Sequence, residues 1–242
     1  MYGLIIQYGS QSDIAYLNKT TVEIITKIIS AQYITHDVRR FRFEKPDGFI
    51  FKPGQATELS VNKEGWTHKS NPFTFTCLID APYLEFTIKI YPEHHGITEQ
   101  LSMLNPGDTV ILREPWGVIA YKGPGYFIAG GAGITPFLAI LRQLHRDGKA
   151  RENKLFYSNK TDIDIILADE LKSMLGDNAH FTVSRQVDSI HDKRRINEDF
   201  LRAEVSDFNK HFYVCGPDPM ILAVSDVLEK LGAKPDAVIF EK

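Results

Sequence analysis

The residues with the clearest chemical potential form a glycine-rich stretch, residues 126–136, in the second half of the chain. It begins with four apolar residues, as a buried strand does, and ends at Pro136, whose fixed φ suits the first turn of a helix. Between them, Gly130, Gly131 and Gly133 let the backbone approach a ligand closely. The free N–H groups and the positive end of the helix dipole would then face a phosphate. The spacing therefore predicts a phosphate-binding turn.

This turn has the pattern G-x-G-x-x-P, which differs from the dinucleotide fingerprint G-x-G-x-x-G at its last position. In the fingerprint, the third glycine allows the helix to pack closely on the strand. A glycine turn between a strand and a helix is often purely structural, so its function depends on the rest of the chain.

The composition excludes several classes of protein. The chain has 242 residues, 43% of them hydrophobic and 24% charged, with a formal net charge of -3. This charge argues against broad nucleic-acid binding, and no stretch approaches the roughly 20 apolar residues of a membrane-spanning helix. Cys77 and Cys215 are too few and too far apart for a disulfide framework or an iron–sulfur cluster. The start of the chain lacks the apolar core of a secretory signal, so we expect a cytoplasmic protein, and a monomer.

The elements before the glycine stretch are short runs of β-branched and aromatic residues, separated by Pro, Gly, Asn and Asp. They predict a small antiparallel β-barrel in a domain of residues 20–121, after an extension of residues 1–19 to which we assign no chemistry. The predicted strands are residues 21–29, 38–44, 56–61, 73–78, 84–90 and 109–113, with one helix at about 98–104.

Beyond a hinge at residues 121–125, strands alternate with helices. The predicted strands are residues 126–129, 155–158, 181–184, 212–215 and 238–240, and the predicted helices are 136–147, 164–175, 197–202 and 218–231. This order predicts an α/β domain, residues 122–242, with a doubly wound parallel sheet. Ligands of such sheets bind at the carboxyl ends of the strands. Besides the glycine turn, those ends carry Ser158-Asn159-Lys160, Ser184-Arg185 and Cys215-Gly216-Pro217.

A motif in the barrel half gives the chain its first resemblance to the ferredoxin–NADP reductase family of flavoproteins. Asn71-Pro72-Phe73-Thr74 is similar to the family's Arg-x-Tyr-Ser/Thr at the end of a barrel strand. The resemblance implies that Phe73 packs against the flavin and that the hydroxyl of Thr74 lies near flavin N5, where hydride arrives.

Asn71 stands where the family usually has an arginine that contacts the flavin phosphates. Asparagine can form a hydrogen bond but supplies no charge. Lys69, Lys89 and the pair His94-His95 are candidates to replace that charge. The histidines are also the most tempting metal ligands, but adjacent side chains on an extended segment point in opposite directions, so we do not expect a metal there.

The second motif, Gly96-Ile97-Thr98, lies within residues 91–101 and resembles the family's Gly-x-Ser/Thr at the start of a helix. Thr98 is predicted to be the N-cap residue. The free N–H groups beside it would hold the flavin pyrophosphate, and Ile90 and Tyr91 would complete this part of the site.

Two motifs of the second half complete the resemblance, which covers residues 21–241. The glycine turn with Thr135 and Pro136 is similar to the turn with which the family binds the nicotinamide dinucleotide pyrophosphate, so the proline is the family's own form. Residues 215–220, Cys-Gly-Pro-Asp-Pro-Met, are similar to its Cys-Gly-Pro-x-x-Met. The resemblance implies that Cys215 lies against the nicotinamide, and that Thr74, Cys215 and Glu241 line the site of hydride transfer. Many relatives end in an aromatic residue that covers the flavin, whereas the last residues here are Phe240-Glu241-Lys242, so we do not expect such a lid.

The resemblance also implies the choice of cofactors. Ser184-Arg185 matches the family's pair of residues for the 2′-phosphate, and Lys193-Arg194-Arg195 could add charge. The carboxylate that signals NAD is absent at the end of the second strand. We therefore expect NADPH rather than NADH, and the resemblance implies FAD rather than FMN. The predicted cofactor-binding residues are Asn71, Pro72, Phe73, Thr74, Ile90, Tyr91, Gly96, Ile97, Thr98, Gly131, Gly133, Thr135, Pro136, Ser184, Arg185, Cys215, Gly216 and Pro217.

The predicted activity is that of a flavin-dependent NAD(P)H oxidoreductase, which passes hydride from NADPH to FAD and then electrons to a separate carrier, a flavodoxin or ferredoxin. Reduction of free flavin or quinone is a related alternative. Two alternatives belong to other classes: a flavin-bearing subunit that relays or senses redox state without turnover, and a nucleotide-binding module without flavin. Bound flavin would exclude the second, and rapid bleaching by a nicotinamide nucleotide would argue against the first.

Overall fold

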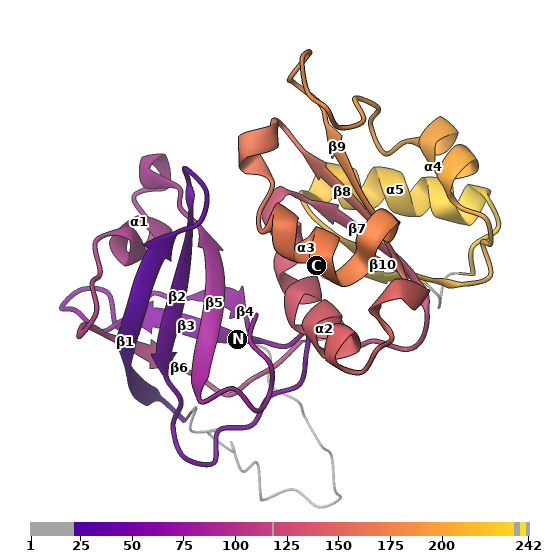
Figure 1. The fold of residues 1–242 in the computed structure, drawn as a ribbon. Coiled ribbons are helices and arrows are strands. Elements are labelled where there is room, and N and C mark those ends of the chain that lie inside the picture. The colour runs from indigo at the N-terminus through magenta and orange to yellow at the C-terminus, as the bar shows by residue number, and fades with distance from the viewer. Residues whose placement is uncertain (1–21, 118, 235–237, 241–242) are drawn as a thin grey trace, which may run out of the picture.

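The computed structural model describes residues 22–117, 119–234 and 238–240, the last three for their backbone. It has two parts, a β-barrel followed by a parallel sheet with helices, and they lie side by side (Figure 1). The predicted two-domain fold is confirmed. The predicted boundary between residues 121 and 122 lies in the segment that joins the last barrel strand to the first strand of the second sheet.

The barrel sheet has six strands in the order β4-β3-β6-β1-β2-β5, and every neighbouring pair is antiparallel. The strands are β1 (Ile24–Tyr33), β2 (Val38–Glu44), β3 (Ala56–Val61), β4 (Asn71–Thr74), β5 (Tyr83–Lys89) and β6 (Thr109–Leu112). The strands β2 and β3 have the predicted bounds.

The strand predicted at residues 73–78 begins earlier and changes partner midway. As β4, it pairs with β3 up to Thr74, opposite Ala56. Phe75 then forms a bridge with Phe86 of β5, and the N–H of Thr76 donates to the carbonyl of Glu85 at 2.8 Å. The apolar stretch is therefore one run in the sequence, but it pairs first with β3 and then with β5. In this way it joins the two ends of the six-stranded sheet.

Aromatic side chains fill the barrel. Phe75 is central, because its ring lies 4.4 Å from that of Phe51 and 4.9 Å from that of Phe86 between ring centroids, and Phe43 packs on Phe86 at 5.4 Å. All four are buried. The short helix α1 (Ile97–Ser102) packs on this core through Ile97 and Leu101.

The second sheet has five parallel strands in the order β11-β10-β7-β8-β9. They are β7 (Gly125–Gly130), β8 (Lys154–Asn159), β9 (Ala179–Val183), β10 (His211–Cys215) and β11 (Val238–Phe240). Alternate side chains of β7 enter two separate cores, Phe127 and Ala129 on one face, and Tyr126 and Ile128 on the other. A sheet buried on both faces explains the continuous apolar runs in its sequence.

Helices cover both faces of this sheet (Figure 1). α2 (Thr135–Arg146) and α3 (Ala168–Leu175) pack on one face, and α4 (Glu198–Glu204) and α5 (Asp218–Lys230) pack on the other. α3 begins four residues later than predicted, because Thr161 and Asp164 form a capping box around a separate 3-10 turn, η4 (Asp162–Asp164). Among the described residues, no helix is long and apolar enough to cross a bilayer.

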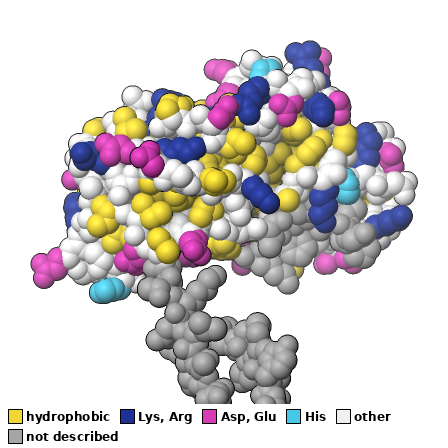
Figure 2. Space-filling view, turned by 90° about the horizontal axis from the view of Figure 1, so that it is seen from below, with side chains coloured by type: hydrophobic (Ala, Val, Ile, Leu, Met, Phe, Trp, Pro, Cys, Tyr) yellow, Lys and Arg dark blue, Asp and Glu magenta, His cyan; other side chains and the backbone are white. Residues whose placement is uncertain are grey.

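The two parts share buried contacts. Val38 of the barrel belongs to the core that α2 and α3 cover, and Ile34 packs against it. The predicted hinge is tied to the second sheet, because the N–H groups of Lys122 and Gly123 donate to the hydroxyl of Tyr213 at 2.9 and 3.1 Å. Hydrophobic side chains are scattered over the face in Figure 2, which spans both parts.

Candidate active site

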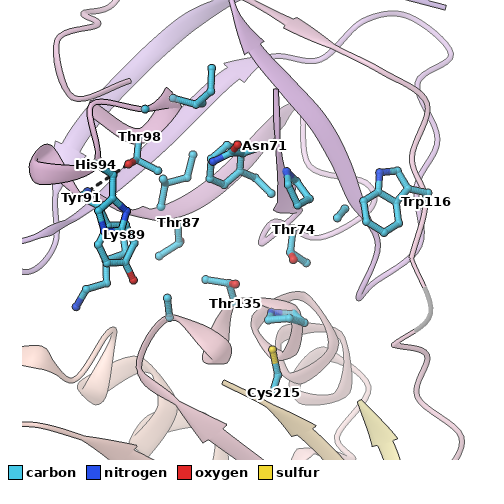
Figure 3. A pocket seen from close by; sticks show the side chains of 18 residues that line it. Asn71, Thr74, Thr87, Lys89, Tyr91, His94, Thr98, Trp116, Thr135 and Cys215 are labelled. Carbon is cyan, nitrogen blue, oxygen red and sulfur yellow. Dashed lines mark hydrogen bonds between the residues drawn. The ribbon is translucent and has the colours of Figure 1, made fainter. Parts of the chain in front are cut away.

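A pocket of about 480 Å³ lies where the barrel meets the second sheet. One wall comes from β4, β5 and the segment around α1, and the opposite wall from the glycine turn, the start of α2 and the end of β10. Figure 3 shows Thr74 and Thr87 on the first side, with Thr135 and Cys215 facing them. The site is therefore built from residues more than 100 positions apart in the sequence.

The barrel wall is held in place by the ladder between β3 and β4. Thr74 is 9% exposed and pairs with Ala56, which also pairs with Trp116. The N–H of Ala56 donates to the carbonyl of Trp116 at 2.7 Å, and the N–H of Trp116 donates back at 2.8 Å. The backbone of Trp116 is thus fixed, while its indole lines the pocket and remains 42% exposed.

The corner at Gly96-Ile97-Thr98 lines the pocket, but Thr98 is not the N-cap of α1, so that prediction was wrong. The N-cap is Gly96, in an extended conformation, and the helix begins at Ile97. The hydroxyl of Thr98 instead accepts from the N–H of Tyr91 at 3.3 Å. It therefore ties the end of the preceding segment to the helix.

The side chains of His94 and His95 make contacts with different partners, as we expected. Their segment, however, is not extended as we expected. They lie at the end of a 3-10 turn, η1 (Pro92–His94), after which His95 has a left-handed φ of 47°. The His94 ring stacks on Tyr91, 5.0 Å between centroids with 5° between the planes, and lines the pocket. His95 faces Glu99, with 3.4 Å between Nδ1 and Oε1.

The lysines proposed to replace the family's arginine have other contacts. Lys89 lines the pocket, but its Nζ lies 2.6 Å from Oδ2 of Asp37. Partial burial would raise the pKa of Asp37, yet the hydrogen bond and charge of Lys89 hold it below its ordinary value. Lys69 lies over the ring of Trp66, with 4.3 Å between Nζ and the centroid. Asn71 is exposed at the pocket, and of the two lysines only Lys89 shares that lining with it.

The opposite wall begins with a 3-10 turn, η2 (Gly131–Ile134), between β7 and α2. Two glycines at this turn, Gly130 at its N-cap and Gly133 within it, are required by protein packing. A Cβ on Gly133 would lie 2.3 Å from the carbonyl oxygen of Cys215, and one on Gly130 would lie 2.4 Å from Sδ of Met220. Gly216 in turn lies against the backbone of Gly130. The turn and the Cys-Gly-Pro motif are therefore pressed together.

Gly131 differs from its neighbours. It has a φ of +53°, and a Cβ there would meet nothing within 4 Å. The hydroxyl of Tyr157, on the adjacent strand β8, donates to its carbonyl at 3.0 Å, and the same hydroxyl accepts from the N–H of Ile166. Burial raises the pKa of Tyr157, so the phenol stays protonated and able to donate. No motif or spacing pointed to this role of Tyr157.

Ser184 and Arg185 follow β9 and are exposed, outside the pocket lining. Their loop is held to η4, because Nε2 of Gln186 and the hydroxyl of Ser189 both donate to the carboxylate of Asp162. In the basic run that follows, Arg194 is bonded to Asp192 and Glu204. Arg194 therefore already has carboxylate partners within the domain.

The structure brings most of the predicted site residues into one pocket. Its lining includes Asn71, Pro72, Phe73, Thr74, Tyr91, Gly96, Ile97, Thr98, Thr135, Pro136 and Cys215. Outside the lining are Ile90, Gly131, Gly133, Ser184, Arg185, Gly216 and Pro217, and Glu241 lies outside the described residues. Sequence reasoning missed Thr87 and Trp116, although an aromatic residue between Pro115 and Gly117 in a loop was a usable signal.

The donor set of this pocket fits a flavin nucleotide. Its volume lies within the range of small-molecule sites, and Phe73, Ile88 and Trp116 supply apolar surface for a flat ring. Threonine hydroxyls at four lining positions, three of them on the barrel wall, supply hydrogen bonds, and the first turn of α1 has N–H groups without partners inside the helix. The barrel wall can therefore bind both a ring and a polar tail.

Comparison with known proteins gives matches over both halves. Residues 26–121 match the model of an oxidoreductase FAD-binding domain, and residues 127–226 match that of an oxidoreductase NAD-binding domain. The reductase component of propane 2-monooxygenase from Rhodococcus jostii (strain RHA1) is 28% identical over 246 residues, which are 91% of this chain and 63% of the relative. The chain thus spans less than two thirds of that relative's length.

Another relative matches along most of both chains. NADH-cytochrome b5 reductase 3 of Rattus norvegicus is 27% identical over 275 residues, covering 96% of this chain and 91% of the relative. Among solved structures, a ferredoxin NADP+ reductase from Neisseria gonorrhoeae with bound FAD and NADP has a TM-score of 0.76 at 19% identity, covering 90% of this chain and 98% of the other. At that identity the likeness shows the fold alone.

Proposed function

The chain belongs to the ferredoxin–NADP reductase family of FAD- and nicotinamide-dependent oxidoreductases, and from this premise we propose that it takes electrons from NADPH and delivers them to a separate one-electron carrier protein, a ferredoxin or flavodoxin. Bound FAD would supply the redox chemistry, because a flavin accepts two electrons from a nicotinamide and can release them one at a time. The task of the protein is to bind the two cofactors, orient them and keep water away.

The observation that carries the proposal is the pair of facing walls in one pocket (Figure 3). Thr74 and Phe73 belong to the barrel wall, and Thr135 and Cys215 belong to the opposite wall. Two rings held between such walls react as if they were one molecule, since their relative position is fixed beforehand. We assign Thr74 a hydrogen bond to the flavin edge, and Cys215 a contact with the nicotinamide.

The preference for NADPH rests on Arg185. It is exposed at the carboxyl end of β9, on a loop that Asp162 fixes, and a guanidinium there can bind a 2′-phosphate through paired hydrogen bonds. Apolar surface for an adenine ring is available beside this loop. It comes from Ile163, which follows Asp162 and is 69% exposed, and from Val187, which follows Gln186 and is 85% exposed. One relative is named an NADH-cytochrome b5 reductase, so NADH is the competing donor.

Steady-state kinetics of the Arg185→Ala variant tests this assignment. Loss of a charge-assisted contact should raise the KM for NADPH roughly 10- to 100-fold, because such bonds contribute about 1.5–3 kcal/mol. The KM for NADH should stay within about twofold. The matched control is Arg202→Ala, which removes an exposed arginine that pairs with Glu198 on α4. Equal losses with both nucleotides would overturn the assignment.

The acceptor is tested by reoxidation. Holoprotein reduced anaerobically with one equivalent of NADPH would be mixed with a ferredoxin, a flavodoxin, free FMN or a quinone, and the return of the flavin absorbance followed. The proposal expects a protein carrier to be the fastest acceptor at equal concentration. Faster reoxidation by free FMN or quinone would identify the chain as a reductase of small molecules instead.

A further inference from the structure

An ion pair joins the two domains outside the pocket lining. It involves Arg142 of α2, whose guanidinium forms four hydrogen bonds. Nε and one terminal nitrogen donate to the two carboxylate oxygens of Glu170 on α3, at 2.6 and 3.0 Å. The other terminal nitrogen donates across the domain contact, to Oε1 of Glu85 on β5 at 2.7 Å and to the carbonyl of Thr76 at 2.6 Å. Glu170 thus orients Arg142 toward the barrel.

The barrel partner, Glu85, is 1% exposed. Its other carboxylate oxygen accepts from Nε of Arg42 on β2 at 3.0 Å, and Oε1 also accepts from the hydroxyl of Thr76 at 3.1 Å. Burial alone would raise the pKa of Glu85, but Arg142 and Arg42 hold it below the ordinary value, so the carboxylate stays charged. Two arginines and two glutamates therefore form a balanced group across the domain contact.

This pair lies close to both walls of the pocket. On α2, Thr135 lines the pocket, and Arg142 follows it seven residues later, about 10 Å along the same helix. On β5, Glu85 and Thr87 share one face of the strand, and Thr87 lines the pocket. The hydroxyls of Thr87 and Thr76 are 3.5 Å apart. Each wall is thus connected to the ion pair through one short, regular element.

A second domain-bridging pair, nearby on the same helix, provides a comparison. Arg146 donates to Asp80 at 2.6 and 2.7 Å, but their side chains are 40% and 65% exposed. Exposed pairs of this kind contribute little to stability, whereas a buried pair has lost the hydration of both charges and keeps its geometry through its hydrogen bonds. The buried pair is the one that can fix a distance.

We propose that Arg142 and Glu85 are positioning residues, which set the separation of the two pocket walls and with it the contact between nicotinamide and flavin. The proposal rests on the proposed function, because the pocket must hold both rings. The pair does not touch either ring. Its effect passes through α2 to Thr135 and through β5 to Thr87. Catalysis depends strongly on such spacing, since a misplacement of about 1 Å can cost about 100-fold in rate.

The test is stopped-flow reduction of the holoprotein by NADPH under anaerobic conditions, over a range of nucleotide concentrations. Arg142→Met keeps most of the side-chain volume but removes the ion pair. We expect the limiting rate of flavin reduction to fall about 10- to 100-fold, while the apparent Kd for NADPH changes less than about threefold and FAD stays bound. Arg142→Lys, which restores the charge without the planar fork, should recover part of the rate. The matched control, Asp80→Asn, should leave both constants unchanged.

A structural readout separates this proposal from the proposed function. Spin labels at D47C and E229C, both exposed positions in different domains, would report the spread of interdomain distances in a C215S background. Cys77 would remain unlabelled, because it is buried and its pKa is raised to about 11. We expect one narrow distribution in the parent protein and in D80N, and a broader or shifted one in R142M.

The outcomes are distinct. If R142M lowers the thermal midpoint but leaves the limiting rate and the label distances unchanged, the pair only stabilises the fold and the proposal is wrong. If the distances change while the parent protein is not reduced by either nucleotide, the proposed function fails and the positioning of the walls stands. If the Kd and the rate worsen equally with unchanged distances, the effect lies in binding and the proposal is wrong.

Discussion

The two domains meet in two regions of opposite character. At the Arg142–Glu85 contact, the charged groups have hydrogen-bond partners, and Glu85 is almost completely buried. About 10 Å away along α2, the pocket is lined mainly by threonines, aromatic residues and small apolar residues, and Trp116 remains 42% exposed. We call the Arg142–Glu85 contact the closed region, because its charged groups are paired and packed. We call the pocket the open region, because solvent reaches its lining.

The difference teaches how one domain contact can be both rigid and accessible. A nucleotide that enters and leaves needs an open gap, while hydride transfer needs two rings at a fixed separation. If the whole contact were open, the domains would move relative to one another, as loosely joined domains do. Fixing one side with a buried ion pair allows the other side to stay open at a constant width.

The largest expected effect comes from breaking the closed region. Glu85→Gln should lower the free energy of unfolding at pH 7 by roughly 3 kcal/mol or more, because it leaves buried arginine charge uncompensated. The folded pKa of Glu85 lies below its ordinary value of 4.5, so its stabilising effect is complete above that pH and is lost as the pH falls through the folded pKa. Denaturant unfolding of both proteins from pH 7 to pH 3 should show the difference shrinking with acid. A difference independent of pH would contradict this role of the charge.

A smaller effect is expected at the wall of the open region. Gly133→Ala would force a Cβ to within 2.3 Å of the carbonyl of Cys215, so the glycine turn and the Cys-Gly-Pro motif must separate. Overpacking of this kind costs typically 1–3 kcal/mol, and nucleotide affinity should fall with it. Gly131→Ala is the control, since it meets no atom within 4 Å and carries only the strain of its positive φ. Calorimetric binding of NADP+ checks both. Equal losses would show that backbone strain, rather than contact between the motifs, controls the turn.

The open region can also be strengthened. Asn71 is exposed at the pocket where the family usually has an arginine. Asn71→Arg should tighten FAD binding about 2- to 5-fold at low salt, because an exposed charge pair contributes up to about 1 kcal/mol and is screened by added salt. Retention of FAD during dialysis at two salt concentrations measures this effect. Unchanged retention would mean that residue 71 does not face the flavin phosphates.

The smallest expected effect is a change in tryptophan fluorescence at Trp116. Measuring it does not depend on a loss of activity. The chain has two tryptophans, Trp66 and Trp116, and only Trp116 lines the pocket. In a Trp66→Phe variant, the remaining indole should lose most of its fluorescence when FAD is added to the apoprotein. In Trp116→Phe, the emission of Trp66 should fall less. Stronger quenching of Trp66 would place the flavin away from the Trp116 side of the pocket.

Local patterns predicted much of this molecule. Both sheets, and β2 and β3 to the residue, follow from alternation and turn residues, because their strands are bounded by Pro, Gly, Asn and Asp. The change of partner at Phe75 did not follow, since an apolar run says nothing about which strand it pairs with. The motifs located most of the pocket lining. Arg142 and Glu85 escaped notice, because a charged residue on an amphipathic helix or strand looks like a solvated one until the opposite domain is placed against it.

The central claim is that NADPH reduces a flavin held in the pocket between the two domains, and the visible spectrum of the purified protein tests it most directly. The spectrum would be recorded anaerobically before and after one equivalent of NADPH, with NADH in a parallel cuvette. We predict a flavin band that NADPH bleaches promptly and NADH bleaches more slowly. A protein that stays colourless after incubation with FAD, or a flavin band that neither nucleotide bleaches, would contradict the account.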